Sequence, residues 1–255
     1  RTVNEGSPVT FTVAALGTPP LSYQWAKDTV TIPGATGASY TIAATQESHE
    51  GDYTCEVSSP SESLTSNAAT LSVNVAPTQP GIGITPAAPN AGNSLLCEVT
   101  SPSTDSDGDT VRYRFEWFFS TNGTDFTGPQ RNVLTAGLSD VLEGSNTLSG
   151  GYWRCIVTPN DGVADGPSAQ TTVSLRLAIT QEPVSTVLAV GGAGSLSVVA
   201  AGTPPISYQW FKAGLTISGA TQSSYAITNA VEQDKGVYTC EVSNPTDTLE
   251  SAPAT

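Results

Sequence analysis

Three aspartates stand at alternate positions near the middle of the chain, in the stretch DSDGDT at residues 105–110. Carboxylates at this spacing around a glycine can fold onto one hard cation, because Ca²⁺ takes roughly 6 to 8 oxygen ligands from a flexible loop. An EF-hand loop is excluded, because Thr110 occupies the position of its invariant glycine. Asp105, Asp107 and Asp109 are therefore candidate calcium ligands. An ordinary solvated turn is the alternative, since Asp and Gly are also common turn residues.

Residues suited to catalysis are few. The sequence has a single histidine, His49, so a nucleophile–base pair or a histidine-based metal site has at most this one candidate. His49 lies in a predicted turn, where a surface role is the simpler interpretation. Carboxylate pairs could act as acid and base, but that mechanism needs a substrate cleft, which a string of small modules does not obviously provide. We therefore expect that the protein is not an enzyme.

The chain is strongly acidic, since 23 Asp and Glu against 9 Lys and Arg give a formal net charge of −14. Such a chain repels phosphate backbones and anionic membrane surfaces, so we expect no nucleic-acid partner. No apolar run reaches the length of about 18 residues that a membrane span needs, so we expect no membrane insertion of this segment. Arg1 does not begin a signal peptide, and the N-terminus reads as a cut end.

A long internal repeat organises the chain. GTPPLSYQW at 17–25 recurs as GTPPISYQW at 202–210, and YTCEVS at 53–58 recurs at 238–243. An offset of 185 residues superimposes the two halves without a gap, from Gly6 and Gly191 onward, and roughly half of the aligned positions are identical. The chain is therefore an array of modules.

The repeated residues resemble those of a known sandwich. A tryptophan on one strand and a Tyr-x-Cys on a later strand are typical of the immunoglobulin fold. The stretches WAKDTVTIPGATGASYTI and WFKAGLTISGATQSSYAI resemble the I-set-like immunoglobulin repeats of large secreted bacterial proteins. The resemblance covers nearly all of both repeats, and it implies an all-β chain of three tandem immunoglobulin-like antiparallel β-sandwiches more than it implies any activity.

We expect three modules. Module one spans residues 1–75 and lacks a first strand, module two spans 76–176, and module three spans 177–255 and repeats module one with its last strand cut short. The missing strand material suggests a window on a longer chain. In module one, alternation of apolar residues predicts inward-facing positions, which recur at plus 185 in module three: Phe11, Val13, Trp25, Ile42, Tyr53, Cys55 and Val57.

The resemblance also assigns the cysteines. Cys97 and Cys155 bracket Trp117 at the spacing of the bridge between the two sheets, which implies a disulfide and an oxidising, extracellular compartment. In the two repeats a valine occupies the position of the first cysteine. We therefore expect Cys55 and Cys240 to be buried, reduced thiols, with intermolecular crosslinking as the alternative.

A second polar loop completes the calcium hypothesis. In this fold the loop before the Trp strand and the loop after the second-cysteine strand lie at the same end. The second of these loops carries Asn160, Asp161 and Asp165. The hypothesis is therefore a Ca²⁺ site near the short linker at residues 76–80, where calcium would limit bending between modules one and two. Its candidate ligands are Asp105, Asp107, Asp109, Asn160, Asp161 and Asp165.

These patterns favour a non-enzymatic, extracellular structural or adhesive array, as a segment of a larger repetitive surface protein or fibre. Its partners would be a protein or glycan at a cell surface, or copies of the chain itself. The alternative is an accessory ligand- or carbohydrate-binding module of a secreted hydrolase. Apart from calcium, no cofactor is expected.

Overall fold

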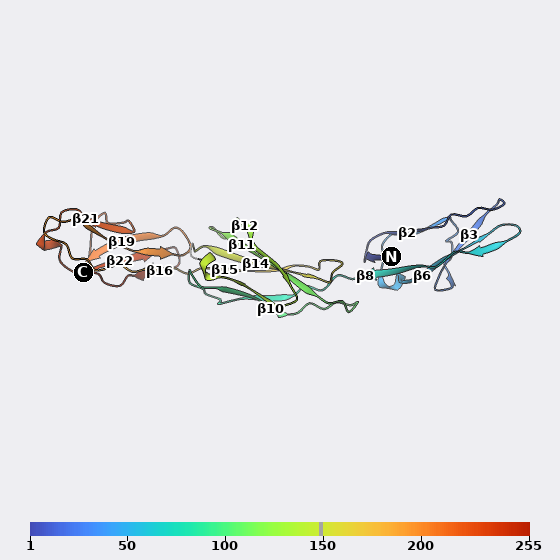
Figure 1. Cartoon of the computed structure of the whole chain (residues 1–255), viewed down its shortest axis with the longest axis horizontal. Helices are drawn as coiled ribbons and strands as arrows, with labels where there is room; N and C mark the ends of the chain where they lie inside the picture. Colours follow the sequence, from blue (N-terminus) through green and yellow to red (C-terminus); the bar gives the residue numbers. More distant parts are fainter. Residues whose placement is uncertain (148–149) are drawn as a thin grey trace. The chain divides into compact units, whose positions relative to one another are not determined.

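The computed structural model describes residues 1–147 and 150–255 and is nearly all β, with 48% of the chain in strands and 4% in helices. It confirms the predicted class, tandem immunoglobulin-like sandwiches (Figure 1). The chain forms two compact units: the first comprises residues 1–79, 103–112 and 159–167, and the second comprises 80–102, 113–158 and 168–255. Two loops of module two thus belong to the same unit as module one.

Module one has a large sheet and a small one. The large sheet contains β1 (Thr2–Asn4), β3 (Ser22–Lys27), β4 (Val30–Thr31), β6 (Gly51–Ser58), β7 (Ser63–Thr65) and β8 (Ala69–Asn74). The small sheet pairs β2 (Val9–Thr12) with β5 (Ser39–Ile42). The sequence did not predict β1, which pairs with β8 in parallel and joins the N-terminal segment to the closing strand.

The core of module one lies between these sheets. Trp25, Tyr53 and Cys55 are buried there, and the Phe11 ring stacks on Tyr53 with a centroid distance of 4.3 Å. Of the inward positions expected in this module, only Val13 and Val57 are partly rather than fully buried. Val13 follows the last residue of β2, so it packs at the edge of the core rather than within it.

Module two has two sheets of its own. One contains β9 (Gly81–Thr85), β10 (Leu95–Ser101) and β13 (Ser139–Leu142), and the other contains β11 (Arg112–Ser120), β12 (Thr127–Thr135), β14 (Tyr152–Asn160) and β15 (Ala169–Ser174). Together the strands of these two sheets bury Trp117, Cys97 and Cys155.

Each of the three modules also contains one short 3₁₀ turn among the described residues. These turns lie at Glu47–His49, Gly144–Asn146 and Glu232–Asp234.

The core tryptophan of module two has a charged partner that the sequence did not reveal. Trp117 Nε1 donates to Asp140 Oδ2 at 2.9 Å, and Asp140 also accepts two hydrogen bonds from the Arg131 guanidinium at 2.7 Å each. In the other modules the equivalent indole N–H of Trp25 or Trp210 donates to a backbone carbonyl. A buried carboxylate needs such pairing, because an isolated buried charge is costly.

Module three repeats the pattern of module one with different edges. Its strands are β16 (Ala178–Gln181), β17 (Gly194–Ser197), β18 (Val199–Ala201), β19 (Ser207–Lys212), β20 (Leu215–Thr216), β21 (Ser224–Ile227), β22 (Tyr238–Ser243) and β23 (Thr248–Glu250). β16 pairs antiparallel with β18. Of the expected inward positions, Trp210, Tyr238 and Cys240 are buried, whereas Ile227 is only partly buried.

Candidate functional site

The Asp105 carboxylate organises its own loop by accepting hydrogen bonds from the loop backbone. Asp105 Oδ1 accepts hydrogen bonds from the N–H groups of Asp107 at 3.0 Å and Asp109 at 3.2 Å, and Gly108 adopts a φ of +80° that favours glycine. Asp105 Oδ2 is buried and accepts no hydrogen bond from the described residues. A buried carboxylate oxygen without a partner is costly, so this atom is suited to a cation or a water.

The structure brings three of the six candidate ligands together. Carboxylate oxygens of Asp105, Asp107 and Asp109 lie within 4.8 Å of one another, and among the described residues no other acidic side chain joins this group. Asn160 and Asp165 are bonded to each other within their own loop, through Nδ2 and Oδ1 at 2.7 Å. The group of three therefore offers fewer oxygens than the six-residue set expected from the sequence.

Both acidic loops contact the end of module one. Asp107 Oδ2 accepts a hydrogen bond from the Val75 N–H at 2.7 Å. Asp161 Oδ2 accepts one from the Asn74 side-chain amide at 2.9 Å, although residues 74 and 161 are far apart in sequence. These groups belong to one compact unit, so the carboxylates hold the residues that follow β8.

The surroundings of Asp161 lower the pKa of its carboxyl group. Partial burial raises the pKa of its carboxyl group, but hydrogen bonds from the Ala164 N–H, the Asn74 amide and the Val163 N–H outweigh burial and hold the pKa below its usual value of 3.8. These N–H groups donate at 2.6 to 2.9 Å. The carboxylate is therefore charged at neutral pH and makes charge-assisted hydrogen bonds, which are stronger than neutral ones.

The linker makes further contacts beyond Val75. The Thr78 N–H donates to the Thr104 carbonyl at 2.9 Å, and the Thr104 N–H donates to Thr78 Oγ1 at 2.8 Å. Gly166 approaches the Pro77 carbonyl so closely that an added Cβ would lie 2.1 Å from that oxygen. Hydrogen bonds and close packing thus fix residues 74–78 against both loops.

A hollow of about 510 Å³ lies beside this linker, and it contains carboxylates from module one as well. Asp107 and Asp109 line it together with Glu47 and Glu50. Glu50 Oε1 accepts a hydrogen bond from the Val73 N–H at 2.7 Å. The hollow is therefore negative on both sides, a setting that favours a cation over an anion.

Sequence reasoning missed the module-one half of this site. Asn74, Val75 and Glu50 gave no signal by themselves, because their partners are residues distant in the chain. The one available clue was position, since residues 74 and 75 immediately precede the linker that the acidic loops were expected to approach.

The four cysteines are all buried. A hydrogen bond with the Cys97 side chain raises the pKa of the Cys155 thiol, and burial raises this pKa further. The two side chains are therefore neighbours in the core of module two. Burial raises the pKa of the Cys55 thiol and raises that of Cys240 to about 11. Since the thiolate is the reactive form, burial disfavours reaction of these two thiols.

His49 has a structural role in its turn. Its Nδ1 accepts a hydrogen bond from the Gln46 N–H at 2.9 Å, and its backbone carbonyl accepts the Tyr53 hydroxyl at 2.7 Å. In module three, Asp234 does both tasks, for the Val231 N–H and the Tyr238 hydroxyl. The histidine therefore replaces an aspartate cap.

Comparison with known proteins supports the fold. Residues 1–59 and 178–244 match the immunoglobulin domain family. A decoration protein of Escherichia phage T5 is 39% identical over 80 residues, covering 31% of this chain and 48% of that protein. Hemicentin-2 of Mus musculus is 26% identical over 271 residues, covering 95% of this chain and 5% of that protein. The chain thus spans less than half the length of these relatives.

Solved structures with the same kind of domain are also similar. A three-domain I-band fragment of titin shares 17% identity at a TM-score of 0.48, covering 100% of this chain and 94% of the fragment. Among the described residues, no helix is long and apolar enough to cross a membrane. The chain is a tandem array of immunoglobulin-like domains. This follows from the family match, the sheet order, the buried tryptophans, and the tyrosine corners, in which the Tyr53 and Tyr238 hydroxyls each donate to a backbone carbonyl four residues earlier.

Proposed function

We propose that the chain is a segment of an extracellular structural or adhesive array, part of a larger repetitive surface protein or fibre. Its partners are a protein or glycan at a cell surface, or copies of itself. The linker after β8 supports this proposal most directly, because Asp107 and Asp161 hold residues 74 and 75 in place. A fixed linker suits a protein that must present its modules at a distance, and one relative is named as a decoration protein.

The holding of the linker is tested by limited proteolysis. Asp107→Ala removes the acceptor for the Val75 N–H, so cleavage between residues 74 and 80 should become several-fold faster than in the parent. Asp125→Ala is the matched control, because it removes an exposed carboxylate from another loop of module two. Equal cleavage rates for the two variants would contradict a role of Asp107 in fixing the linker.

Adhesion is tested with beads coated with the chain. The array proposal predicts that coated beads aggregate or attach to cells, whereas beads coated with the reduced, alkylated and unfolded chain do not. Binding restricted to one soluble polysaccharide, without attachment to surfaces, would instead favour an accessory module of a secreted hydrolase.

We also propose that Ca²⁺ binds at Asp105, Asp107 and Asp109. Their carboxylate oxygens are within 4.8 Å of one another, and Asp105 Oδ2 is buried without a hydrogen bond, which fits a hard cation with oxygen ligands. Asp161 in the neighbouring loop and Glu50 of module one would add negative charge around the ion. A bound ion would order the loop against the linker.

Thermal unfolding with calcium and with a chelator tests this site. A ligand that binds only the folded state stabilises it by about 2.7 kcal/mol at 100 times its dissociation constant. The parent and Asp125→Ala should therefore melt at a higher temperature in calcium, and Asp107→Ala should lose that increase. Equal melting temperatures of the parent in both conditions would show that the three aspartates form a solvated turn and bind no calcium.

Cys97 and Cys155 form a disulfide in this proposal. The two thiols are neighbours in the module-two core, and an oxidising, extracellular compartment would join them. Cys55 and Cys240 stay reduced, because each is enclosed in the core of a different module.

A further inference from the structure

The connection between modules two and three consists of only three residues, Leu175, Arg176 and Leu177, which lie between β15 and β16. Leu175 is 1% exposed, and Leu177 is 4% exposed and belongs to the core of module three. Module two holds the Arg176 backbone, since its N–H donates to the Pro89 carbonyl at 2.7 Å and its carbonyl accepts the Ala91 N–H at 3.4 Å. The connection is therefore too short and too closely held to act as a flexible tether.

One carboxylate of module three binds this connection. Asp247 lies in the loop that follows β22, and its Oδ1 pairs with the Arg176 guanidinium at 3.1 Å. Its Oδ2 accepts a hydrogen bond from the Leu177 N–H at 3.3 Å. The hydrogen bond from Arg176 holds the pKa of the Asp247 carboxyl group below its usual value of 3.8, so the carboxylate is charged at neutral pH. Both of its oxygens are therefore engaged by the connection.

The Asp247 loop is fixed in turn by a second loop of module three. Asn244 Oδ1 accepts the Asp247 N–H at 2.7 Å, and Asn244 Nδ2 donates to the Thr203 carbonyl at 3.1 Å. The Thr203 hydroxyl donates to the Leu175 carbonyl at 2.9 Å, a hydrogen bond that is buried. Two loops of module three thus bind the same connection, one through a carboxylate and the other through a hydroxyl.

Two glycines allow the backbones of the modules to approach each other closely. A Cβ added at Gly150 of module two would overlap the Gly202 carbonyl oxygen, and one added at Gly202 would lie 2.9 Å from Leu177 Cα. Gly150 also adopts a φ of +74°, which favours glycine. A side chain at either position would push the two modules apart, so close packing accompanies the hydrogen bonds.

The linker after module one is held in a similar way but with a different balance of charge. There the loop that follows β14 supplies Asp161, whose partner is the uncharged Asn74 amide. The nearby Asp107 accepts the Val75 N–H, so negative charge accumulates at that linker. At Asp247 the Arg176 guanidinium balances the carboxylate, and the charge-assisted pair leaves little for a divalent cation to bind.

We propose that Asp247 fixes modules two and three as one rigid pair, and that it does so without calcium. Neighbouring domains usually move relative to each other unless their contacts prevent it. Here the Asp247 carboxylate, the Thr203 hydroxyl and the two glycines set the direction in which module three leaves module two. This rigid pair does not depend on what the array binds or on calcium at the Asp105 loop.

Residual dipolar couplings of the backbone amides, measured on the whole chain, test this proposal. Couplings from modules two and three of the parent should fit one alignment tensor, in calcium and in chelator alike, because a rigid pair aligns as one body. Asp247→Ala removes both bonds to the connection and should require a separate tensor for each module.

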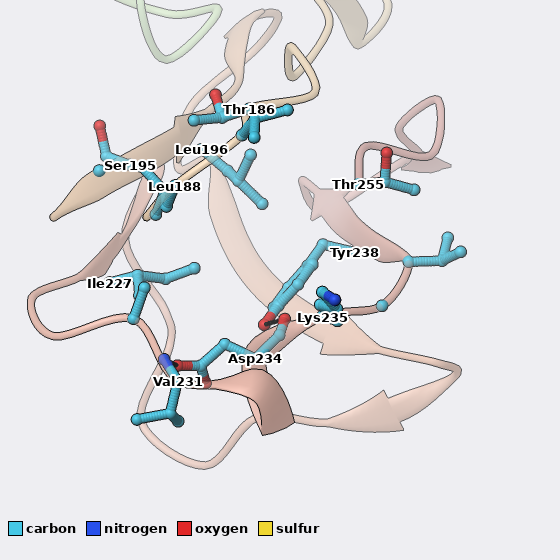
Figure 2. Close-up of a pocket in the computed structure, with 15 residues that line it drawn as sticks. Thr186, Leu188, Ser195, Leu196, Ile227, Val231, Asp234, Lys235, Tyr238 and Thr255 are labelled. Carbon is cyan, nitrogen blue, oxygen red and sulfur yellow. Dashed lines mark hydrogen bonds between the residues drawn. The ribbon is translucent and has the colours of Figure 1, made fainter. Parts of the chain in front are cut away.

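Glu232→Ala is the matched control and should keep the single tensor. It also removes an ion pair, with Lys235, but that pair lies in the turn of Asp234 and Lys235 (Figure 2). The hydrogen bonds of Asp234 in this turn join it to Val231 and Tyr238 of the same module.

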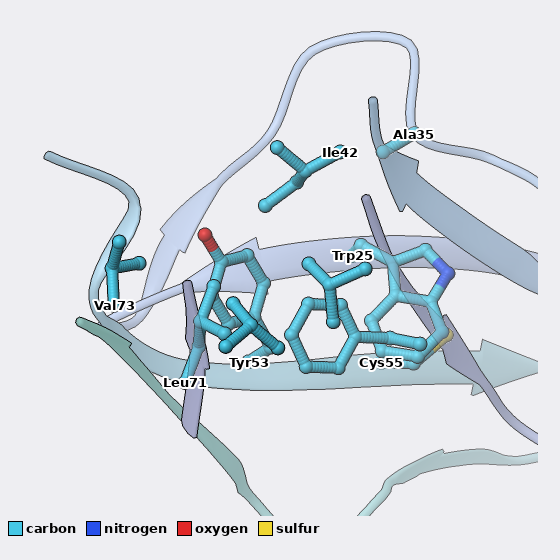
Figure 3. Packing of buried hydrophobic residues seen from close by; sticks show 10 residues of the cluster. Trp25, Ala35, Ile42, Tyr53, Cys55, Leu71 and Val73 are labelled. Atoms are coloured by element: carbon cyan, nitrogen blue, oxygen red, sulfur yellow. The ribbon is translucent and has the colours of Figure 1, made fainter. Parts of the chain in front are cut away.

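Two further readouts separate a loosened pair from an unfolded module. The amide shifts of the module-one core, which encloses Trp25 (Figure 3), should stay unchanged because module one belongs to the other compact unit. The amide shift of the buried Cys240 reports whether module three is folded. If Asp247→Ala unfolds module three, Arg176→Ala decides instead, because it removes the ion pair from the side of module two.

Three results would overturn the proposal. The first is a single tensor for modules two and three in the folded Asp247→Ala variant, or in Arg176→Ala where that variant decides. The second is a parent that needs two tensors, in calcium or in chelator. The third is loss of the single tensor in Glu232→Ala as well, because the effect would then not be specific to the connection.

Discussion

Modules one and three are built from the same repeated sequence, yet they differ in the turn that precedes the tyrosine strand. Both bury the tryptophan, the tyrosine and the cysteine at equivalent positions, and both anchor the tyrosine hydroxyl to a backbone carbonyl at 2.7 Å. The acceptor in that turn is His49 Nδ1 for the Gln46 N–H in module one and Asp234 Oδ2 for the Val231 N–H in module three. The shared residues therefore specify the centre of the sandwich, and the turn accepts either side chain.

The cysteines distinguish both repeats from the module between them, and this contrast carries the largest expected effect. Reduction of the proposed Cys97–Cys155 disulfide should lower the free energy of unfolding of module two by about 4 kcal/mol, because such a bond closes a long loop in the unfolded chain. Modules one and three should unfold at unchanged denaturant concentrations. Denaturation followed by fluorescence, with and without a reducing agent, measures the difference.

Counting of thiols in the unfolded, unreduced chain is the control for this prediction. Cys55 and Cys240 should react, and Cys97 and Cys155 should not. A chain with no reactive thiol, or a ladder of reducible oligomers, would show that the lone cysteines form crosslinks.

Removing the apolar anchor of the closing strand should destabilise module one. Leu71 is 1% exposed, and Leu71→Ala should lower the free energy of unfolding of module one by about 3 kcal/mol, within the usual range for a buried leucine. Leu64→Ala is the control, since Leu64 is 71% exposed. A loss of comparable size in the control variant would contradict the role assigned to β8. Urea denaturation gives both values.

The tyrosine corners should behave identically in the two modules. Tyr53→Phe and Tyr238→Phe each remove one hydrogen bond, to the carbonyl of His49 or Asp234, so each should cost about 1 kcal/mol. Because the corner is formed within the repeat, the two losses should be equal. Unequal losses, measured by chemical denaturation, would show that residues outside the shared sequence affect the corner.

Acid should loosen the linker after module one. The pKa of Asp161 is depressed, so its contribution to stability is complete above its usual value of 3.8 and is lost as the pH falls through the lower value in the folded state. Asp161→Asn should remove this acid-dependent part, roughly 1 kcal/mol for the hydrogen bonds of one carboxylate. Unfolding experiments at a series of pH values measure it, and an unchanged pH profile in the variant would reject the assignment.

The smallest effect concerns the cap that differs between the repeats. His49→Asp should be nearly neutral, because Asp234 makes the same hydrogen bond in module three, whereas His49→Ala should cost about 0.5 kcal/mol through the loss of an acceptor at the start of the turn. The reciprocal change, Asp234→His, is the matched control. Melting temperatures of the three variants rank these effects, and a destabilised His49→Asp would break the equivalence of the two caps.

Much of the fold could be predicted from local sequence. Trp25, Tyr53 and Cys55 are buried as alternation predicted. The edges were harder, because an edge strand such as β1 has few apolar residues of its own. Its three residues become a strand through pairing with β8, about seventy positions away.

The sequence by itself determined the repeat, the all-β class and the identity of the core residues, because apolar alternation and turn residues act over a few neighbouring positions. Only the tertiary structure decided which acidic side chains meet residues distant in the sequence. The alternate spacing of Asp105, Asp107 and Asp109 already predicted that these three meet, whereas only the fold placed Asp161 on Asn74, a residue that no local pattern marks. Hydrogen bonds across such sequence distances depend on the packing of whole sheets, so composition and spacing cannot reveal them.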